Sequence, residues 1–170
     1  MLTLFSLLLS ITTIYFYVIE TVDASPPTMT LSIPAIGLKS EVIPINYTTI
    51  TANDGKQYLE WHVDDNLIGW HKVTAPLGEV GNTVLNGHSN AGGMVFQHLH
   101  EVQVGTIMTA TVYTQSYVYT VTDRVIVTEA GATIEQRVAN ARWILPTNDN
   151  RLTLITCISG TNRLIVVTKR

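Results

Sequence analysis

The sequence contains one cysteine, Cys157, at the end of the stretch TLITC. A thiolate is a strong nucleophile, and cysteine enzymes pair it with a proton-transfer group, most often a histidine. Arg163 follows after the five residues ISGTN, whose turn formers favour a tight hairpin with Cys157 and Arg163 opposite each other. A guanidinium near a thiol favours the thiolate and holds a developing oxyanion. The pair predicts nucleophilic catalysis, and the alternative is a cysteine that fills space in a buried strand.

Five histidines are candidates for the proton-transfer partner: His62, His71, His88, His98 and His100. His88 is favoured because it ends the strand-like stretch NTVLNGH and precedes the open loop SNAGG. His98 and His100 are two residues apart and would share one face of a strand, but no third metal ligand is evident. His62 and His71 each stand beside a tryptophan and fit loop or packing positions. We therefore predict His88 as the acid–base residue and no metal site.

The elements that must position these residues are mostly strands. Stretches dense in β-branched and aromatic residues predict strands over 82–88, 106–114, 116–129, 151–157 and 163–169. The segment 31–45 alternates loosely and is interrupted by Pro34, Gly37 and Pro44, which suits edge strands. The sequence thus predicts a mostly β domain of about seven or eight strands, either a closed barrel or a sandwich.

One short helix is predicted between residues 133 and 146. Apolar residues recur at helical spacing on a single face: Ile134, Val138, Ala141 and Leu145. Thr133 and Gln136 form a potential capping box at its start, and Pro146 supplies the stop.

The N-terminal residues predict attachment to a membrane. Residues 1–19 carry no charge, and as a helix they would span nearly the roughly 30 Å hydrocarbon core. An uncleaved signal anchor is the first interpretation; a cleaved signal peptide ending before Ser25 and a buried core helix are the alternatives. We predict a membrane anchor or signal segment over 1–22, a linker over 23–30 and a catalytic domain over 31–170. The expected location is the plasma membrane, single-pass, with the domain outside the cytoplasm.

Length and charge restrict the remaining classes. The 170 residues suffice for one domain with a core. The net charge of −3, without a cluster of Lys and Arg, argues against a nucleic-acid partner.

Four segments, in order over residues 31–170, resemble the sortases, the cysteine transpeptidases of bacterial surfaces. TLITC resembles the TLxTC signature of that family, VLNGHSN its histidine segment and NRLIVVTKR its arginine strand. LSIPAIGLKSEV is similar to the opening strand of the domain. The histidine segment extends backward through GWHKVTAPLGEVGNTVLNGH, which resembles the family segment that leads into the histidine. The resemblance implies a closed eight-stranded β-barrel with one or two short helices.

The resemblance also implies the chemistry. Cys157 would be the nucleophile, His88 the acid–base residue and Arg163 the substrate and oxyanion contact, with Thr156 and Asn90 as further substrate contacts. The substrate would be an LPxTG-like sorting signal, cleaved between Thr and Gly through a thioacyl intermediate. The acceptor would be an amine of the cell wall or of another protein. No cofactor is expected; a calcium site is less favoured than a solvated acidic surface for four residues, Glu60, Asp64, Asp65 and Glu79.

Departures from the family pattern bear on the class. The loop 158–162 is shorter than expected for class A, and 130–150 carries only a short helix, unlike class B. No Asp-Pro-aromatic lid is present near 24–30, which argues against class C. We therefore predict a class D/E/F-like enzyme. The alternatives are a sortase-fold peptidase that mainly hydrolyses its intermediate and a non-catalytic surface β-barrel that binds a partner.

Overall fold

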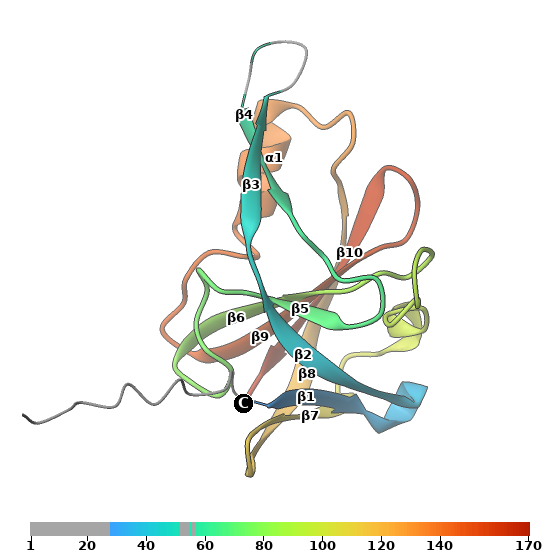
Figure 1. Ribbon diagram of the computed structural model, residues 1–170, viewed down its shortest axis with the longest axis vertical. Helices are drawn as coiled ribbons and strands as arrows, with labels where there is room; N and C mark the ends of the chain where they lie inside the picture. Colours follow the sequence, from blue (N-terminus) through green and yellow to red (C-terminus); the bar gives the residue numbers. More distant parts are fainter. Residues whose placement is uncertain (1–27, 52–54, 56) are drawn as a thin grey trace, which may run out of the picture.

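The computed structural model describes residues 28–51, 55 and 57–170 (Figure 1). The predicted anchor 1–22 and most of the linker 23–30 lie outside the described residues. Within the described residues, no helix has the length and apolar character to cross a bilayer. The regular elements of the described residues are mostly strands, with one α-helix and two short 3₁₀ turns, η1 (Pro34–Ile36) and η2 (Leu99–Glu101).

Eight strands form a closed barrel, as the resemblance implied. Around the barrel the order is β1 (Met29–Ile33), β2 (Leu38–Ile45), β5 (Ile68–His71), β6 (Gly81–Asn86), β9 (Asn150–Cys157), β10 (Asn162–Lys169), β8 (Gln115–Thr128) and β7 (Ile107–Val112). β7 pairs with β1 and closes the ring. Two further strands, β3 (Tyr47–Thr51) and β4 (Gln57–Trp61), form a separate hairpin that stands out from the barrel (Figure 1). The helix α1 (Ile134–Ala141) follows β8 in the chain and precedes β9.

The parallel pair β6–β9 fixes which residues meet at one end of the barrel. Asn86, the last residue of β6, is in register with Ile155, two residues before the end of β9. Because parallel neighbours end at the same edge of a sheet, the segment after β6 and the end of β9 emerge side by side. β10 pairs antiparallel with β9, so its first residues return to the same edge.

Alternating side chains fill the barrel and set the register of its strands. In β10, Leu164 and Val166 belong to the central core, whereas Ile165 and Val167 form a second cluster with Val127, against which Trp143 packs. A slip of one residue would exchange these two sets. Burial of each such aliphatic side chain stabilises the fold by about 1.5–3 kcal/mol, which makes the slip costly.

The prediction of edge strands over 31–45 is wrong, because the closed barrel gives both β1 and β2 two neighbours. Pro44 is accommodated by register. The pairing of β2 with β1 reaches only as far as Val42, and Pro44 pairs with β5 alone, opposite Trp70. The missing N–H of the proline therefore interrupts no ladder on the β1 side.

The predicted helix forms with its capping box, since the Thr133 hydroxyl accepts from the Gln136 amide and the Gln136 side chain accepts from the Thr133 amide. It ends at Ala141, so Leu145 lies beyond it. Its apolar face does not pack on the barrel, because Ile134 and Val138 are 64% and 69% exposed. The barrel is contacted instead by Trp143, in the segment after the helix.

Asp149 links the start of β9 to the end of β10 through its side chain, and its ion pairs predict an effect on stability. Its Oδ2 lies 3.0 Å from Lys169 Nζ and 3.1 Å from Arg151 Nη2, and these partners hold the pKa of the carboxyl well below its ordinary value of 3.8. A lowered folded-state pKa adds stability above the ordinary value, and that contribution is lost as the pH falls through the folded-state value.

We expect Asp149→Asn to lower the free energy of unfolding by about 1 kcal/mol at pH 7, since the pair is partly exposed. At pH 3 the difference from the wild type should shrink. Urea unfolding at both pH values measures it, with Asp123→Asn, on the exposed Asp123, as the matched control. If the variant and the wild type differ in free energy of unfolding by the same amount at both pH values, the lowered pKa assigned to Asp149 is contradicted.

Candidate active site

Cys157 is the last residue of β9 and is half-buried. It lies directly opposite Arg163 in the β9–β10 register. The Ile158 amide donates to the Asn162 carbonyl at 3.2 Å and closes the turn. The hairpin predicted from ISGTN therefore forms, and it places the thiol and the guanidinium side chains on neighbouring strands.

His88 follows β6 by two residues and is held from both sides through its backbone. The Gly87 amide donates to the Ile155 carbonyl of β9 at 3.2 Å, and the His88 carbonyl accepts from the Phe96 amide at 2.8 Å. Gly87 allows close packing, because a Cβ there would lie 2.7 Å from the Phe96 side chain. The position of His88 thus depends on a residue without a side chain before it.

Cys157, His88 and Arg163 line one pocket of about 570 Å³, so the structure brings the three predicted residues together. We call this the catalytic pocket. Its other walls come from the hairpin, from the end of β8 and from the connection after α1, in the residues Leu59, Glu60, Trp61, Glu129 and Ile144. The sequence analysis did not find these wall residues, and the hairpin that carries three of them was not predicted at all.

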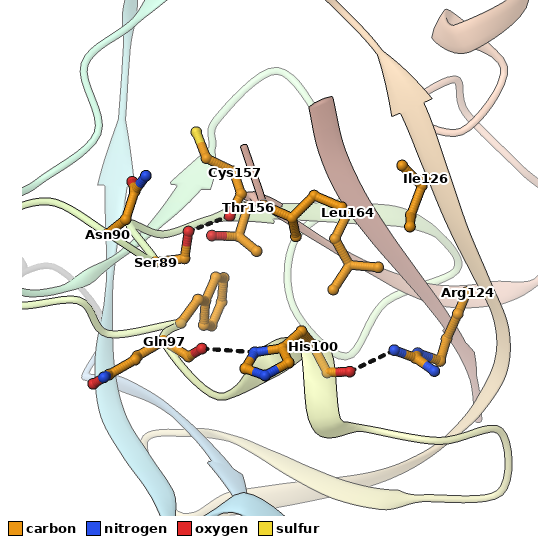
Figure 2. Close-up of a pocket in the computed structure, with 11 residues that line it drawn as sticks. Ser89, Asn90, Gln97, His100, Arg124, Ile126, Thr156, Cys157 and Leu164 are labelled. Carbon is orange, nitrogen blue, oxygen red and sulfur yellow. Dashed lines mark hydrogen bonds between the residues drawn. The ribbon is translucent and has the colours of Figure 1, made fainter. Parts of the chain in front are cut away.

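A second pocket of about 430 Å³ reaches Cys157 from its other flank (Figure 2). It shares Thr156 and Cys157 with the catalytic pocket and is otherwise lined by Ser89, Asn90, Phe96, Gln97, His100, Arg124, Ile126, Ile158 and Leu164. Figure 2 shows Cys157 at one rim and Arg124 with His100 at the opposite one. We call this the flanking pocket. Cys157 therefore borders both pockets.

The two predicted secondary contacts differ in their surroundings. Thr156 is buried, and its hydroxyl donates to the Gly87 carbonyl at 2.7 Å, so this group is engaged within the protein. Asn90 is exposed and lines the flanking pocket. The sequence analysis missed Ser89, whose hydroxyl donates to the Cys157 carbonyl (Figure 2).

His71 has the packing position expected for it. It is only 3% exposed and its ring stacks on Trp61, with centroids 3.6 Å apart and planes 19° apart. Burial lowers its pKa to about 4, with the nearby Asn86 side chain acting in the opposite direction. His71 is therefore neutral at neutral pH. His62 is exposed and its Nε2 bonds to the Thr48 hydroxyl at 3.1 Å.

The acidic and histidine groups considered as metal ligands are not assembled. Among residues 28–51, 55 and 57–170, no three His, Cys, Asp or Glu side chains are grouped as a metal ion would need. Asp64 Oδ1 accepts the amides of Asn66 and Leu67, both at 2.8 Å. The prediction that His98 and His100 share a strand is wrong: His98 precedes η2 and His100 lies within it, because the Leu99 and Glu101 amides form turn hydrogen bonds.

The comparison with known families agrees with this geometry. A family model described as the sortase domain matches residues 31–170. The chain belongs to the sortase family. It is accordingly an enzyme, a cysteine transpeptidase, and sortases act on sorting signals and amine acceptors. No curated protein compared with the chain matches it in sequence.

Solved structures with a similar fold come from several sortase classes. A Clostridium perfringens sortase D5 transpeptidase has a TM-score of 0.62 at 21% identity, with 84% of this chain and 78% of that chain covered. Sortase A of Listeria monocytogenes and a T196V mutant of Streptomyces avermitilis sortase E each have a TM-score of 0.60 at 22% identity, covering 84% of this chain and 86% of theirs. Likeness at these identities shows the shared fold, and the class D/E/F-like assignment stays a prediction.

The Thr156 hydrogen bond gives a prediction about the position of His88. Thr156→Val keeps the side-chain volume but leaves the buried Gly87 carbonyl without this donor. We expect the free energy of unfolding to fall by about 1–2 kcal/mol and peptide cleavage to slow, because Gly87 leads directly into His88. Urea unfolding and initial rates measure the two effects. Thr161→Val, at an exposed threonine in the adjacent turn, is the matched control; equal rates in the two variants would contradict this role for Thr156.

Proposed function

We propose that the protein cleaves an LPxTG-like sorting signal between Thr and Gly and transfers the new acyl group to a cell-surface amine. The observation that carries this proposal is the catalytic pocket, in which Cys157, His88 and Arg163 meet at one end of the barrel. Three different segments supply these side chains: β9 carries Cys157, and the segments of Arg163 and His88 are held beside it by backbone pairing with β9.

The first half-reaction forms a thioester. The Cys157 thiolate attacks the threonine carbonyl carbon, and the Arg163 guanidinium stabilises the negative charge that develops on the carbonyl oxygen. His88, in its protonated form, donates a proton to the glycine nitrogen as the C–N bond breaks. The products are an acyl group joined to Cys157 Sγ and a free amine.

The second half-reaction reverses these roles. An acceptor amine attacks the thioester carbon, His88 accepts a proton from the nitrogen, and the C–S bond breaks to restore the thiolate. The leaving amine and the incoming amine occupy the same place relative to the carbonyl, so one pocket serves both. We assign the flanking pocket to the chain that continues beyond the amine nitrogen, because polar side chains such as Ser89, Asn90 and Gln97 line it, whereas the nitrogen itself lies in the catalytic pocket within reach of His88. No step requires a cofactor.

The two alternatives to acyl transfer are hydrolysis of the thioester and binding without catalysis. If water reaches it as readily as an amine does, the protein is mainly a peptidase. A non-catalytic binding module would instead need an inert Cys157, and a half-buried thiol that lines two pockets argues against that.

The membrane location remains part of the proposal. Residues 1–19 would anchor the chain as a single pass in the plasma membrane, with the barrel outside the cytoplasm. Fractionation with protease accessibility on intact cells tests this, and recovery of the full-length chain in the cytosol would contradict it.

The chemistry is tested with the full chain in detergent, LPxTG, LAxTG and LPxTA peptides, and oligoglycine. Mass spectrometry should show an acyl adduct on Cys157 and a peptide–oligoglycine product. Cys157→Ala should form neither, and His88→Ala and Arg163→Ala should slow both by a factor of about 10² or more. Hydrolysed peptide alone in the presence of oligoglycine would favour the peptidase, and no adduct from any peptide would contradict the proposed function.

A further inference from the structure

The β3–β4 hairpin is joined to the barrel by very few side-chain contacts. All five residues of β3 are exposed, and a lone two-stranded hairpin is only marginally stable in water. Its principal contact with the barrel is the stack of Trp61 on His71. Tyr47 supports Trp61 from the opposite strand in an edge-on contact, with centroids 5.1 Å apart. Trp61 is therefore held by ring contacts from two sides.

The hairpin presents one face of β4 to the catalytic pocket. Leu59 and Trp61 are two residues apart on this strand and so share a face. Both line the catalytic pocket, and both also line an adjoining groove of about 580 Å³. The groove continues over apolar residues, Val73, Val80, Leu145 and Pro146. The two spaces adjoin along the hairpin, and we call them together the channel, although Leu59 itself is 58% exposed.

The position of the stack corresponds to a defined length of substrate. Trp70, the neighbour of His71, pairs with Leu85, and Leu85 pairs with Leu154, three residues before Cys157. His71 is one residue further along, so its backbone lies about 13 Å from that of Cys157 along the strand direction, at ~3.3 Å per residue, and two strands, or about 10 Å, to the side. An extended peptide that runs obliquely from Cys157 toward the stack covers this separation with about four to five residues.

The ring that supports Trp61 is enclosed by the protein. His71 is 3% exposed, and the Asn86 side chain lies close enough to raise its pKa against the effect of burial. Both residues line the catalytic pocket, so the support of Trp61 belongs to the wall of the site.

We propose that the β3–β4 hairpin is a recognition arm for the part of the sorting signal that precedes the scissile bond. Leu59 and Trp61 are its specificity-determining contacts, and they bind the side chain of the fourth residue before that bond. His71 is a positioning residue that holds Trp61 in place. This inference rests on the proposed function. It assigns the channel to the part of the signal that becomes the acyl group, because the part after the scissile bond and the acceptor are assigned to the flanking pocket.

The test compares signal peptides with Leu or Ala at that fourth position, using the full chain. Leu59→Ala and Trp61→Ala should raise KM for the Leu peptide about tenfold, reduce the preference for Leu over Ala and leave kcat within about twofold. Ile50→Ala is the matched control, since Ile50 lies on the same hairpin and is exposed but lines neither space. Thermal unfolding of each variant verifies that it is folded.

His71 is tested by replacement of its ring. His71→Ala should raise KM as Trp61→Ala does, and His71→Phe, which keeps a flat ring against Trp61, should restore most of the wild-type KM. Equal KM in wild type and His71→Ala would overturn the positioning role.

The inference fails if the wild type cleaves the peptides and the two hairpin variants keep its KM and its preference, or if they change KM for the amine instead. Peptide binding to Cys157→Ala, measured by calorimetry, separates this failure from that of the proposed function. If no peptide is cleaved, weaker binding after Leu59→Ala still supports the arm, and unchanged binding overturns it.

Discussion

The parallel pairing of β6 with β9 is the constraint on which the site depends. Asn86 in register with Ile155 brings the segment after β6 to the end of β9, so that His88 and Cys157 enter one pocket although they are far apart in sequence. The hydrogen bonds of Gly87 to Ile155 and of Thr156 to Gly87 extend this pairing beyond the last ladder residue. A shift of the register by one residue would turn these side chains to the other face of the sheet.

The same edge of the barrel explains why Cys157 has two accessible flanks. The connection after α1 and the β3–β4 hairpin enclose one side, and the loop after His88 encloses the other. In the proposed reaction the peptide and the acceptor amine must both reach the carbon that becomes joined to Cys157, and pockets on two flanks of this residue would give each its own approach. The buried hydrogen bonds of Asn82 to the Trp143 and Leu145 carbonyls fasten the wall after α1 to the barrel.

Local patterns in the sequence predicted those features that short-range chemistry controls. The capping box of α1 formed because Thr133 and Gln136 satisfy each other's backbone groups within one turn. The β9–β10 hairpin formed because a five-residue turn leaves few alternatives for Cys157 and Arg163. The barrel, by contrast, was implied by resemblance, since alternation in strands does not state whether a sheet closes. The exposed face of α1 and the β3–β4 hairpin were not predicted, because the first depends on distant packing and the second on strands with little burial pattern.

The sequence by itself determined most of the barrel strands, the hairpin that places Cys157 opposite Arg163 and, through the order of four motifs, the sortase family. Only the tertiary structure decided that His88 lies in the same pocket, that Trp61 rests on His71 and that the hairpin borders the channel. The physical reason is the range of the interactions. Turns, caps and alternation act over a few residues, whereas the pairing of β6 with β9 joins segments whose approach depends on closure of the whole barrel.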